Sequence, residues 1–188
     1  MKKVVVVVVN LSMSNVNSNY FKLLGFDESF DICEKSLHQS YMKLQKLVHP
    51  DILSHKSQVD KMQGLQLSAD VNQAYQTLKN PLKRAEYLLS LNNIYVGSEK
   101  NAVKAEMPLL MESMELREAL ASCDEMSKLV DMLEQAKSLQ TESEIRFANE
   151  FSNNDLLKAS QTVIRWRFIE KYIEEIKQKI KHINYTKN

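Results

Sequence analysis

The chain has 188 residues, of which 44% are hydrophobic, and its 25 Lys and Arg against 24 Asp and Glu give a formal net charge of +1. A chain of this length has room for one or two domains with a core, and three Gly and three Pro are few for the turns of a sheet. The near-zero charge argues against nucleic acid as a partner, because phosphate binding requires a marked basic excess. We therefore expect an all-α protein that does not bind nucleic acid.

The first residues form an apolar run that is short for a targeting signal. Lys2 and Lys3 precede a run of valines over residues 4–9, which imitates the start of a signal peptide. The run ends at Asn10, below the about 7–15 apolar residues of such a region, and no small-residue cleavage site follows. A membrane span would need about 20 apolar residues, so no membrane association is expected. We expect residues 1–19 to be a disordered or loosely attached extension, and a targeting segment is the alternative.

The two cysteines are isolated in the sequence. Cys33 and Cys123 belong to no C-x-x-C pair. Two such thiols are typical of a reduced, cytoplasmic protein, and they are too few for a four-thiolate metal site. We expect no disulfide, no bound metal and no cofactor.

A helical run leads into the tripeptide His49-Pro50-Asp51. Its apolar positions recur at i, i+4, i+7 and i+11, which is one stripe of an amphipathic helix: Leu37, Tyr41, Leu44 and Val48. Pro50 has no backbone N–H and moves His49 into an extended conformation, so the helix ends there. An imidazole and a carboxylate are then presented to solvent. Lys43 and Lys46 lie off the apolar stripe, either as a solvated face or as a basic surface that guides an acidic partner.

A second long helix is predicted over about residues 57–79, antiparallel to the first. Its buried positions are predicted to be Leu65, Leu67, Val71, Ala74, Tyr75 and Leu78. Asn80 and Pro81 then predict the start of a further helix, with Asn80 as its cap and Pro81 at its first position. The two long helices form a hairpin whose connecting loop carries the tripeptide.

Four segments of this region, in this order, resemble a J-domain. They are residues 20–25 (YFKLLG), the tripeptide at 49–51, residues 72–78 (NQAYQTL) and residues 81–85 (PLKRA). The resemblance implies that residues 20–91 form a J-domain, an antiparallel helical hairpin with short flanking helices that stimulates the ATPase of a partner chaperone. We assign chaperone binding to His49, Pro50 and Asp51, together with Lys43 and Lys46.

A linker and three long helices are predicted for the rest of the chain. Polar residues over 92–104 indicate the linker. The helices are expected over about 107–122, 124–151 and 154–184, and their short connections predict an antiparallel three-helix bundle over 105–188. The core stripe of the last helix is predicted to be Trp166, Ile169, Ile173, Ile176, Ile180 and Ile183.

The first helix of this bundle has a second apolar face. Its core stripe is predicted to be Leu109, Leu116, Leu120 and Cys123. Leu110, Met111 and Met114 fall on a different side, among charged residues. Such a face is either a docking surface or a contact with another element of the chain, and both readings stay open. On the last helix, Phe168 points about 100° away from the core stripe.

Three further segments resemble the HscB family of iron–sulfur co-chaperones. They are residues 84–89 (RAEYLL), 110–118 (LMESMELRE) and 167–171 (RFIEK). The resemblance implies a co-chaperone in iron–sulfur cluster biogenesis, not an enzyme. Its J-domain would act on an HscA/DnaK-type ATPase chaperone, and its C-terminal bundle would bind an IscU-type scaffold protein. Carried over by position, the scaffold-binding residues are Leu110, Met111, Met114, Glu115, Glu118 and Phe168.

Two other functions are alternatives to this one. A general J-domain co-chaperone that presents other clients is the alternative within the same class. Such a protein is expected to contain a Gly/Phe-rich segment or a zinc-binding cysteine module, and this sequence has neither. An enzyme using His49 and Asp51 as acid and base is disfavoured. The two residues are too close in sequence, across a proline, to aim at one reacting atom.

Overall fold

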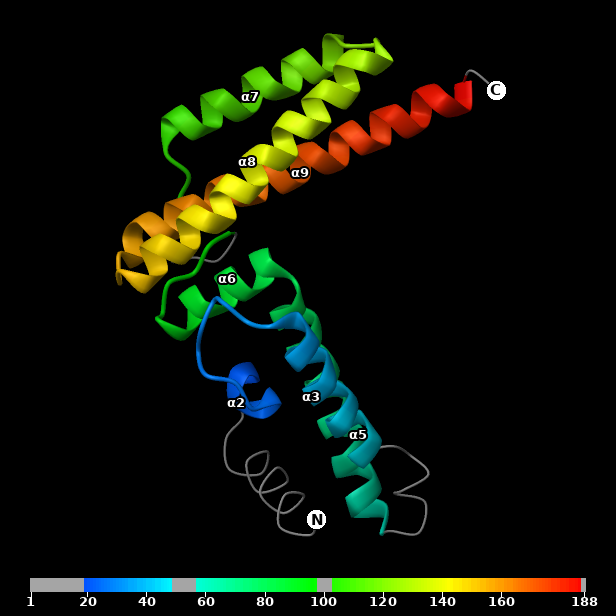
Figure 1. The fold of residues 1–188 in the computed structure, drawn as a ribbon, viewed down its shortest axis with the longest axis vertical. Helices are drawn as coiled ribbons and strands as arrows, with labels where there is room; N and C mark the ends of the chain where they lie inside the picture. Colours follow the sequence, from blue (N-terminus) through cyan, green and yellow to red (C-terminus); the bar gives the residue numbers. More distant parts are fainter. Residues whose placement is uncertain (1–18, 49–56, 98–102, 187–188) are drawn as a thin grey trace. The chain divides into compact units, whose positions relative to one another are not determined.

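The computed structural model describes residues 19–48, 57–97 and 103–186, and within these ranges the chain is helical and has no strand. A single parallel bridge joins Val96 to Val103. The described helices are α2 (Tyr20–Leu24), α3 (Glu34–Leu47), α5 (Gln58–Lys79), α6 (Pro81–Leu91), α7 (Met107–Ser122), α8 (Met126–Ser152) and α9 (Leu156–Thr186) (Figure 1). The predicted all-α class is confirmed. Among these helices, none combines the length and the apolar character needed to cross a bilayer.

Packing divides the chain into two units, one ending at Arg84 and the other beginning at Ala85, inside α6. The domain boundary after residue 91 and the linker over 92–104 stay predictions. Asn19, the last residue of the predicted extension, is the N-cap of α2, because its Oδ1 accepts a hydrogen bond from the backbone N–H of Phe21 at 2.9 Å. Residues 1–18 of that extension lie outside the described residues.

In the first unit, α3 and α5 pair as a helical hairpin, and α2 packs against both of them. The buried apolar side chains are Phe21, Leu24, Leu37, Leu44, Leu67, Val71, Ala74 and Leu78. They recur at helical spacing, so each long helix places one apolar stripe in the shared core. Leu65 is an exception to the prediction, since it is 63% exposed and does not belong to the core. Two residues before Leu67, it points about 160° away from that buried position.

A polar and aromatic seam joins α3 to α5 beside this core. The rings of Tyr41 and Tyr75 stack with their centroids 4.1 Å apart. The Tyr41 hydroxyl donates to Asn72 Oδ1 at 2.9 Å, and Gln45 Nε2 donates to the same oxygen at 2.7 Å. His38 Nδ1 lies 3.0 Å from the Tyr75 hydroxyl. Because these contacts are directional, they fix the position of α3 along α5. They therefore also fix the position of the C-terminal end of α3 relative to α5.

The helix starts follow local sequence signals. The Ser57 hydroxyl accepts a hydrogen bond from the backbone N–H of Asp60 at the start of α5. At the start of α6, Asn80 Oδ1 accepts from the backbone N–H of Lys83 at 2.9 Å, and Pro81 is the first helical residue. The predicted cap and first position of this helix are confirmed.

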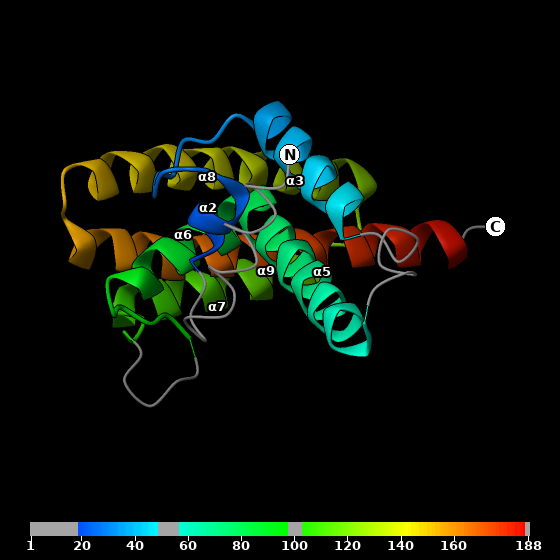
Figure 2. The ribbon, with the colours of Figure 1, turned by 90° about the horizontal axis from the view of Figure 1, so that it is seen from below.

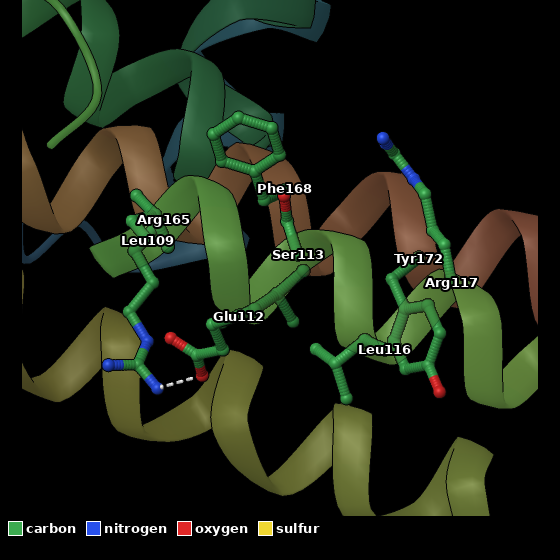
Figure 3. A pocket seen from close by; sticks show the side chains of 9 residues that line it. Leu109, Glu112, Ser113, Leu116, Arg117, Arg165, Phe168 and Tyr172 are labelled. Atoms are coloured by element: carbon green, nitrogen blue, oxygen red, sulfur yellow. Dashed lines mark hydrogen bonds and ion pairs between the residues drawn. The ribbon is translucent and has the colours of Figure 1, made fainter. Parts of the chain in front are cut away.

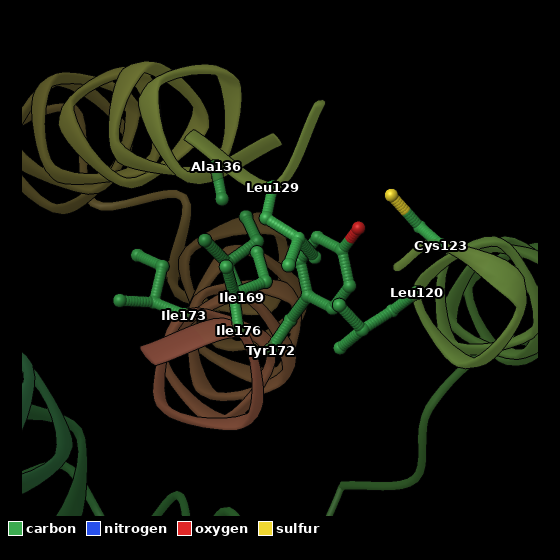
Figure 4. Packing of buried hydrophobic residues seen from close by; sticks show 8 residues of the cluster. All are labelled: Leu120, Cys123, Leu129, Ala136, Ile169, Tyr172, Ile173 and Ile176. Atoms are coloured by element: carbon green, nitrogen blue, oxygen red, sulfur yellow. The ribbon is translucent and has the colours of Figure 1, made fainter. Parts of the chain in front are cut away.

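In the second unit, α8 and α9 run antiparallel side by side (Figures 1 and 2). Their shared core contains Leu129, Ala136, Ile169, Tyr172, Ile173 and Ile176, and Leu120 and Cys123 reach it from α7 (Figure 4). The predicted core stripe of the last helix is confirmed. Trp166 is 1% exposed, and Ile180 and Ile183 are partly buried against the cluster. Helix α7 packs on α9, but much less extensively than α8 does.

Candidate functional site

The described part of the predicted chaperone-binding set lies at the end of α3. Lys43 and Lys46 are both exposed and stand three residues apart, so their charges lie on one face of the last turns. Helix α3 ends at Leu47, and the C-cap residue Val48 is buried, with its backbone N–H bonded to the Leu44 carbonyl at 3.2 Å. The tripeptide His49-Pro50-Asp51 follows directly and lies outside the described residues.

The predicted scaffold-binding set centres on α7, whose inner face lies toward α9. Ser113 and Leu120 on this face are buried, and Leu109 and Leu116 are half-buried. A small hollow of about 20 Å³ lies between the two helices (Figure 3). The residues of α9 that line it include Phe168 and Tyr172. Burial raises the pKa of the Tyr172 phenol.

Polar contacts hold α7 on α9 at both ends of this hollow. Arg165 Nη2 lies 2.7 Å from Glu112 Oε1, and Arg117 Nε lies 3.3 Å from Glu175 Oε2. Both ion pairs are partly exposed, so each contributes modestly to stability, about 0.2–1 kcal/mol for pairs of this kind. They help to set the position and rotation of α7, which packs on α9 much less extensively than α8 does.

The side chain of Lys179, on α9, caps the C-terminal end of α7. Its Nζ donates to the carbonyl oxygens of Leu120 at 2.8 Å and Ala121 at 2.9 Å, and lies 3.2 Å from Asp124 Oδ1. These carbonyls belong to the last turn, where the helix dipole favours a cation, and Leu120 also accepts from the backbone N–H of Cys123 at 3.3 Å.

Replacing Lys179 with Met is expected to weaken this attachment. Two charge-assisted hydrogen bonds to helix-end carbonyls are lost, and we expect the free energy of unfolding to fall by about 1–2 kcal/mol. Chemical denaturation of the full chain measures this. The matched control is Lys177→Met. Lys177 is exposed and lies two residues before Lys179 on the same helix, so its replacement should change stability by less than about 0.5 kcal/mol. Equal losses in the two variants would contradict a capping role for Lys179.

The outer face of α7 carries five of the six predicted scaffold-binding residues. Met111 and Met114 are 58% and 61% exposed, Glu115 and Glu118 are also exposed, and Leu110 is half-buried. At 100° per residue these five cover a continuous arc of about 140° that begins beside Arg117. None of the five belongs to the bundle core cluster.

Phe168 completes this surface from α9. It is half-buried and borders the hollow, and Figure 3 shows it projecting past Ser113 on the side of α7 that carries Arg117. Leu110 and Met114 fall on that same side of α7. Phe168 therefore lies beside the edge of the arc that carries Leu110, and Glu115 lies at the opposite edge. We call this surface, Leu110, Met111, Met114, Glu115, Glu118 and Phe168, the α7 face.

Sequence reasoning missed two contributors to this region. Met107 is 68% exposed and stands four residues before Met111, so its side chain continues the α7 face by one turn. The i, i+4, i+7 spacing of the methionines was the available signal. The Glu112–Arg165 pair joins residues 53 positions apart, and nothing local in the sequence indicates it.

The described residues offer no cluster of three or more His, Cys, Asp or Glu side chains placed to hold a metal ion. Cys33 is exposed and Cys123 is buried, and both are free thiols.

Comparison with known families and proteins agrees with this architecture. Residues 19–87 match the model of the DnaJ domain, and residues 105–177 match the model described as the HSCB C-terminal oligomerisation domain. A DnaJ domain followed by this helical domain defines a J-domain co-chaperone. The chain belongs to the HscB family of these co-chaperones.

Individual relatives cover most of the chain. The Co-chaperone protein HscB homolog of Aliivibrio fischeri is 35% identical over 164 residues, which are 85% of this chain and 95% of that protein. The structure of chaperone HscB from Vibrio cholerae matches with a TM-score of 0.76 at 34% identity, over 85% of this chain and 96% of that one. Human co-chaperone protein HscB matches with a TM-score of 0.81 at 31% identity, over 88% and 83% of the two chains.

Proposed function

We propose that this protein is an adaptor in iron–sulfur cluster biogenesis. Its J-domain stimulates the ATPase of an HscA/DnaK-type chaperone, and its second unit delivers an IscU-type scaffold protein to that chaperone. The observation that carries the proposal is the combination of a DnaJ domain with an α7 face that stays out of the bundle core. In this role the chain supplies no catalytic group, metal or cofactor. We place it in the cytoplasm, where thiols such as Cys33 stay reduced.

The α7 face has the chemistry of a protein-docking surface. Leu110, Met111 and Phe168 provide large apolar side chains, and a few such anchors dominate the binding energy of most interfaces. Glu115 and Glu118 border them with negative charge. A partner with basic side chains opposite these glutamates would associate faster and in one orientation.

The first unit supplies the contacts with the ATPase chaperone. Asp51 is suited to a charge-assisted contact with an arginine of the chaperone, and His49 to a directional hydrogen bond. Lys43 and Lys46 favour an acidic surface on the chaperone. Stimulation requires only that the J-domain bind the hydrolysing state of the chaperone, or its transition state, more tightly than the resting state.

The test is binding and stimulation with purified partners. Mixed with an IscU-type scaffold, the chain is expected to elute as a complex in size-exclusion chromatography, and the pair should stimulate the chaperone ATPase more than the chain alone. Stimulation without scaffold binding would favour the general J-domain co-chaperone instead. Failure of both assays would contradict the proposal.

A further inference from the structure

Three methionines form an exposed stripe along α7. Met107, Met111 and Met114 are 68%, 58% and 61% exposed, and they stand at i, i+4 and i+7 of a helix of 16 residues. This spacing places them on one side of the helix, and Leu110 lies next to the stripe, about 40° from Met114. No other described helix carries more than two methionines. Met111 and Met114 are thus two of the four apolar residues of the α7 face, and Met107 extends it by a third thioether.

A thioether differs from other apolar side chains in that a peroxide can oxidise it. The sulfur lone pair attacks one oxygen of hydrogen peroxide, the O–O bond breaks, and the second oxygen leaves as water. The methionine is oxidised by two electrons to the sulfoxide, and the peroxide is reduced by two. The product is polar, and polarity of this kind disrupts methionine-rich interfaces. Burying a sulfoxide against an apolar partner without a hydrogen bond opposes docking.

We propose that Met107, Met111 and Met114 are a peroxide-sensitive modification site, and that their oxidation to sulfoxide switches off docking of the scaffold protein at the α7 face. The proposal rests on the proposed function, because it takes scaffold docking as the activity that is switched. It also adds Met107 to the docking surface. When the chain is reduced, the stripe is apolar and binds; when it is oxidised, the same helix presents three polar groups.

The placement of the other methionines within the described residues keeps this effect local. Met132 is half-buried against the bundle core and Met126 is also half-buried, so both are less accessible to peroxide. Met42 and Met62 are exposed at 42% and 66%, but they lie on α3 and α5 of the first unit. Oxidation of the exposed methionines therefore leaves the core of the second unit intact. The expected result is loss of docking without loss of fold.

The experiment uses the full chain and hydrogen peroxide. The chain is treated with increasing peroxide, the excess is removed with catalase, and sulfoxides are mapped by digestion and mass spectrometry. Binding to untreated scaffold protein is measured by calorimetry, and helicity by circular dichroism. We expect Met107, Met111 and Met114 to oxidise before Met126 and Met132. Affinity should fall roughly tenfold or more, because apolar anchors dominate such an interface, while helicity stays unchanged.

Matched variants assign the effect to the stripe. The variant M107L/M111L/M114L keeps similar side-chain volumes and cannot be oxidised there, so its scaffold affinity after peroxide should equal its own affinity before treatment, whatever that starting value is. The variant M42L/M62L replaces two exposed methionines outside the stripe and should lose binding as the wild type does. Cys33 also competes for peroxide, since hydrogen bonds from the side chain and backbone of Ser36 lower the pKa of its thiol. Cys33 precedes α3 in the first unit and is not part of the α7 face. A C33S variant should therefore still lose scaffold affinity after peroxide treatment.

A reversal experiment gives a measurement that needs no substitution. Methionine sulfoxide reductases of both stereospecificities, with dithiothreitol as reductant, should remove the sulfoxides from the wild type and restore binding. Unchanged affinity with all three sulfoxides present would overturn the proposal, and so would a failure to regain affinity once they are reduced. Absence of binding by the untreated wild type would instead contradict the proposed function, which keeps the two failures distinguishable.

Discussion

A His49→Gln variant is expected to leave the chaperone ATPase at its basal rate. Glutamine keeps a polar side chain of similar reach but lacks the imidazole, so the directional contact assigned to His49 is lost. The described helices α3 and α5 are held by their own buried core and by the Tyr41–Tyr75 stack, so we expect the variant to keep its helicity. Steady-state ATP hydrolysis with purified chaperone measures the effect, and scaffold binding should match the wild type.

The control for this variant is His55→Gln, which changes the other histidine of the 49–56 segment and should stimulate normally. Lys43→Ala and Lys46→Ala should reduce stimulation only partly, and the reduction should shrink as salt is added, because exposed charges are screened. Wild-type stimulation by the His49→Gln variant would contradict the assignment of this residue to the chaperone contact.

The second large effect is expected from the triple variant L110A/M111A/F168A. Loss of three apolar anchors should weaken scaffold binding roughly a hundredfold or more, since one or two such anchors are each worth 2 kcal/mol or more at an interface. Met111 is exposed and the other two are half-buried, so the loss of stability should be limited to about 2 kcal/mol. Calorimetry with the scaffold and chemical denaturation of the variant measure the two effects. The variant should still stimulate the ATPase through its intact first unit.

The matched control is Ile173→Ala. Ile173 is 6% exposed and points away from α7 in the bundle core (Figure 4). Its truncation should cost about 2–5 kcal/mol of stability and leave scaffold affinity close to that of the wild type. If the triple variant instead unfolds as readily as Ile173→Ala, the three residues belong to the core and the docking site lies elsewhere.

Local signals in the sequence were sufficient for the helices and for the core of α9. Hydrophobic periodicity and helix-capping residues decide these features. Examples are the Asn80 cap of α6 and the isoleucine stripe of Ile169, Ile173 and Ile176. Leu65 shows the limit of this reasoning. It is a leucine inside a helix, but its direction around α5 relative to Leu67 and Val71 places it in solvent. The direction of a side chain, more than its type, decides its burial.

The α7 face was predictable in part. Its residues were visible as apolar positions off the core stripe, but whether they would be buried depended on what packs against α7. The answer lies in contacts between residues far apart in the sequence, such as Arg117 with Glu175 and Lys179 with Leu120. Such pairs leave no periodic signal. The rotation of α7 on α9, and with it the exposure of Met111 and Met114, therefore required the structure.

The polar attachment of α7 also determines how the second unit opens. Helices α8 and α9 share an extensive apolar core, whereas α7 is joined to α9 mainly near Leu120 and through Glu112, Arg117 and the Lys179 contacts. Amide groups protected by few apolar contacts exchange with solvent through low-energy local openings, while those of a packed core exchange only on global unfolding. We therefore expect α7 to open with a lower free energy than the α8–α9 hairpin that carries it, which hydrogen exchange of its amides would measure. The element with the docking residues can readjust while its support stays folded.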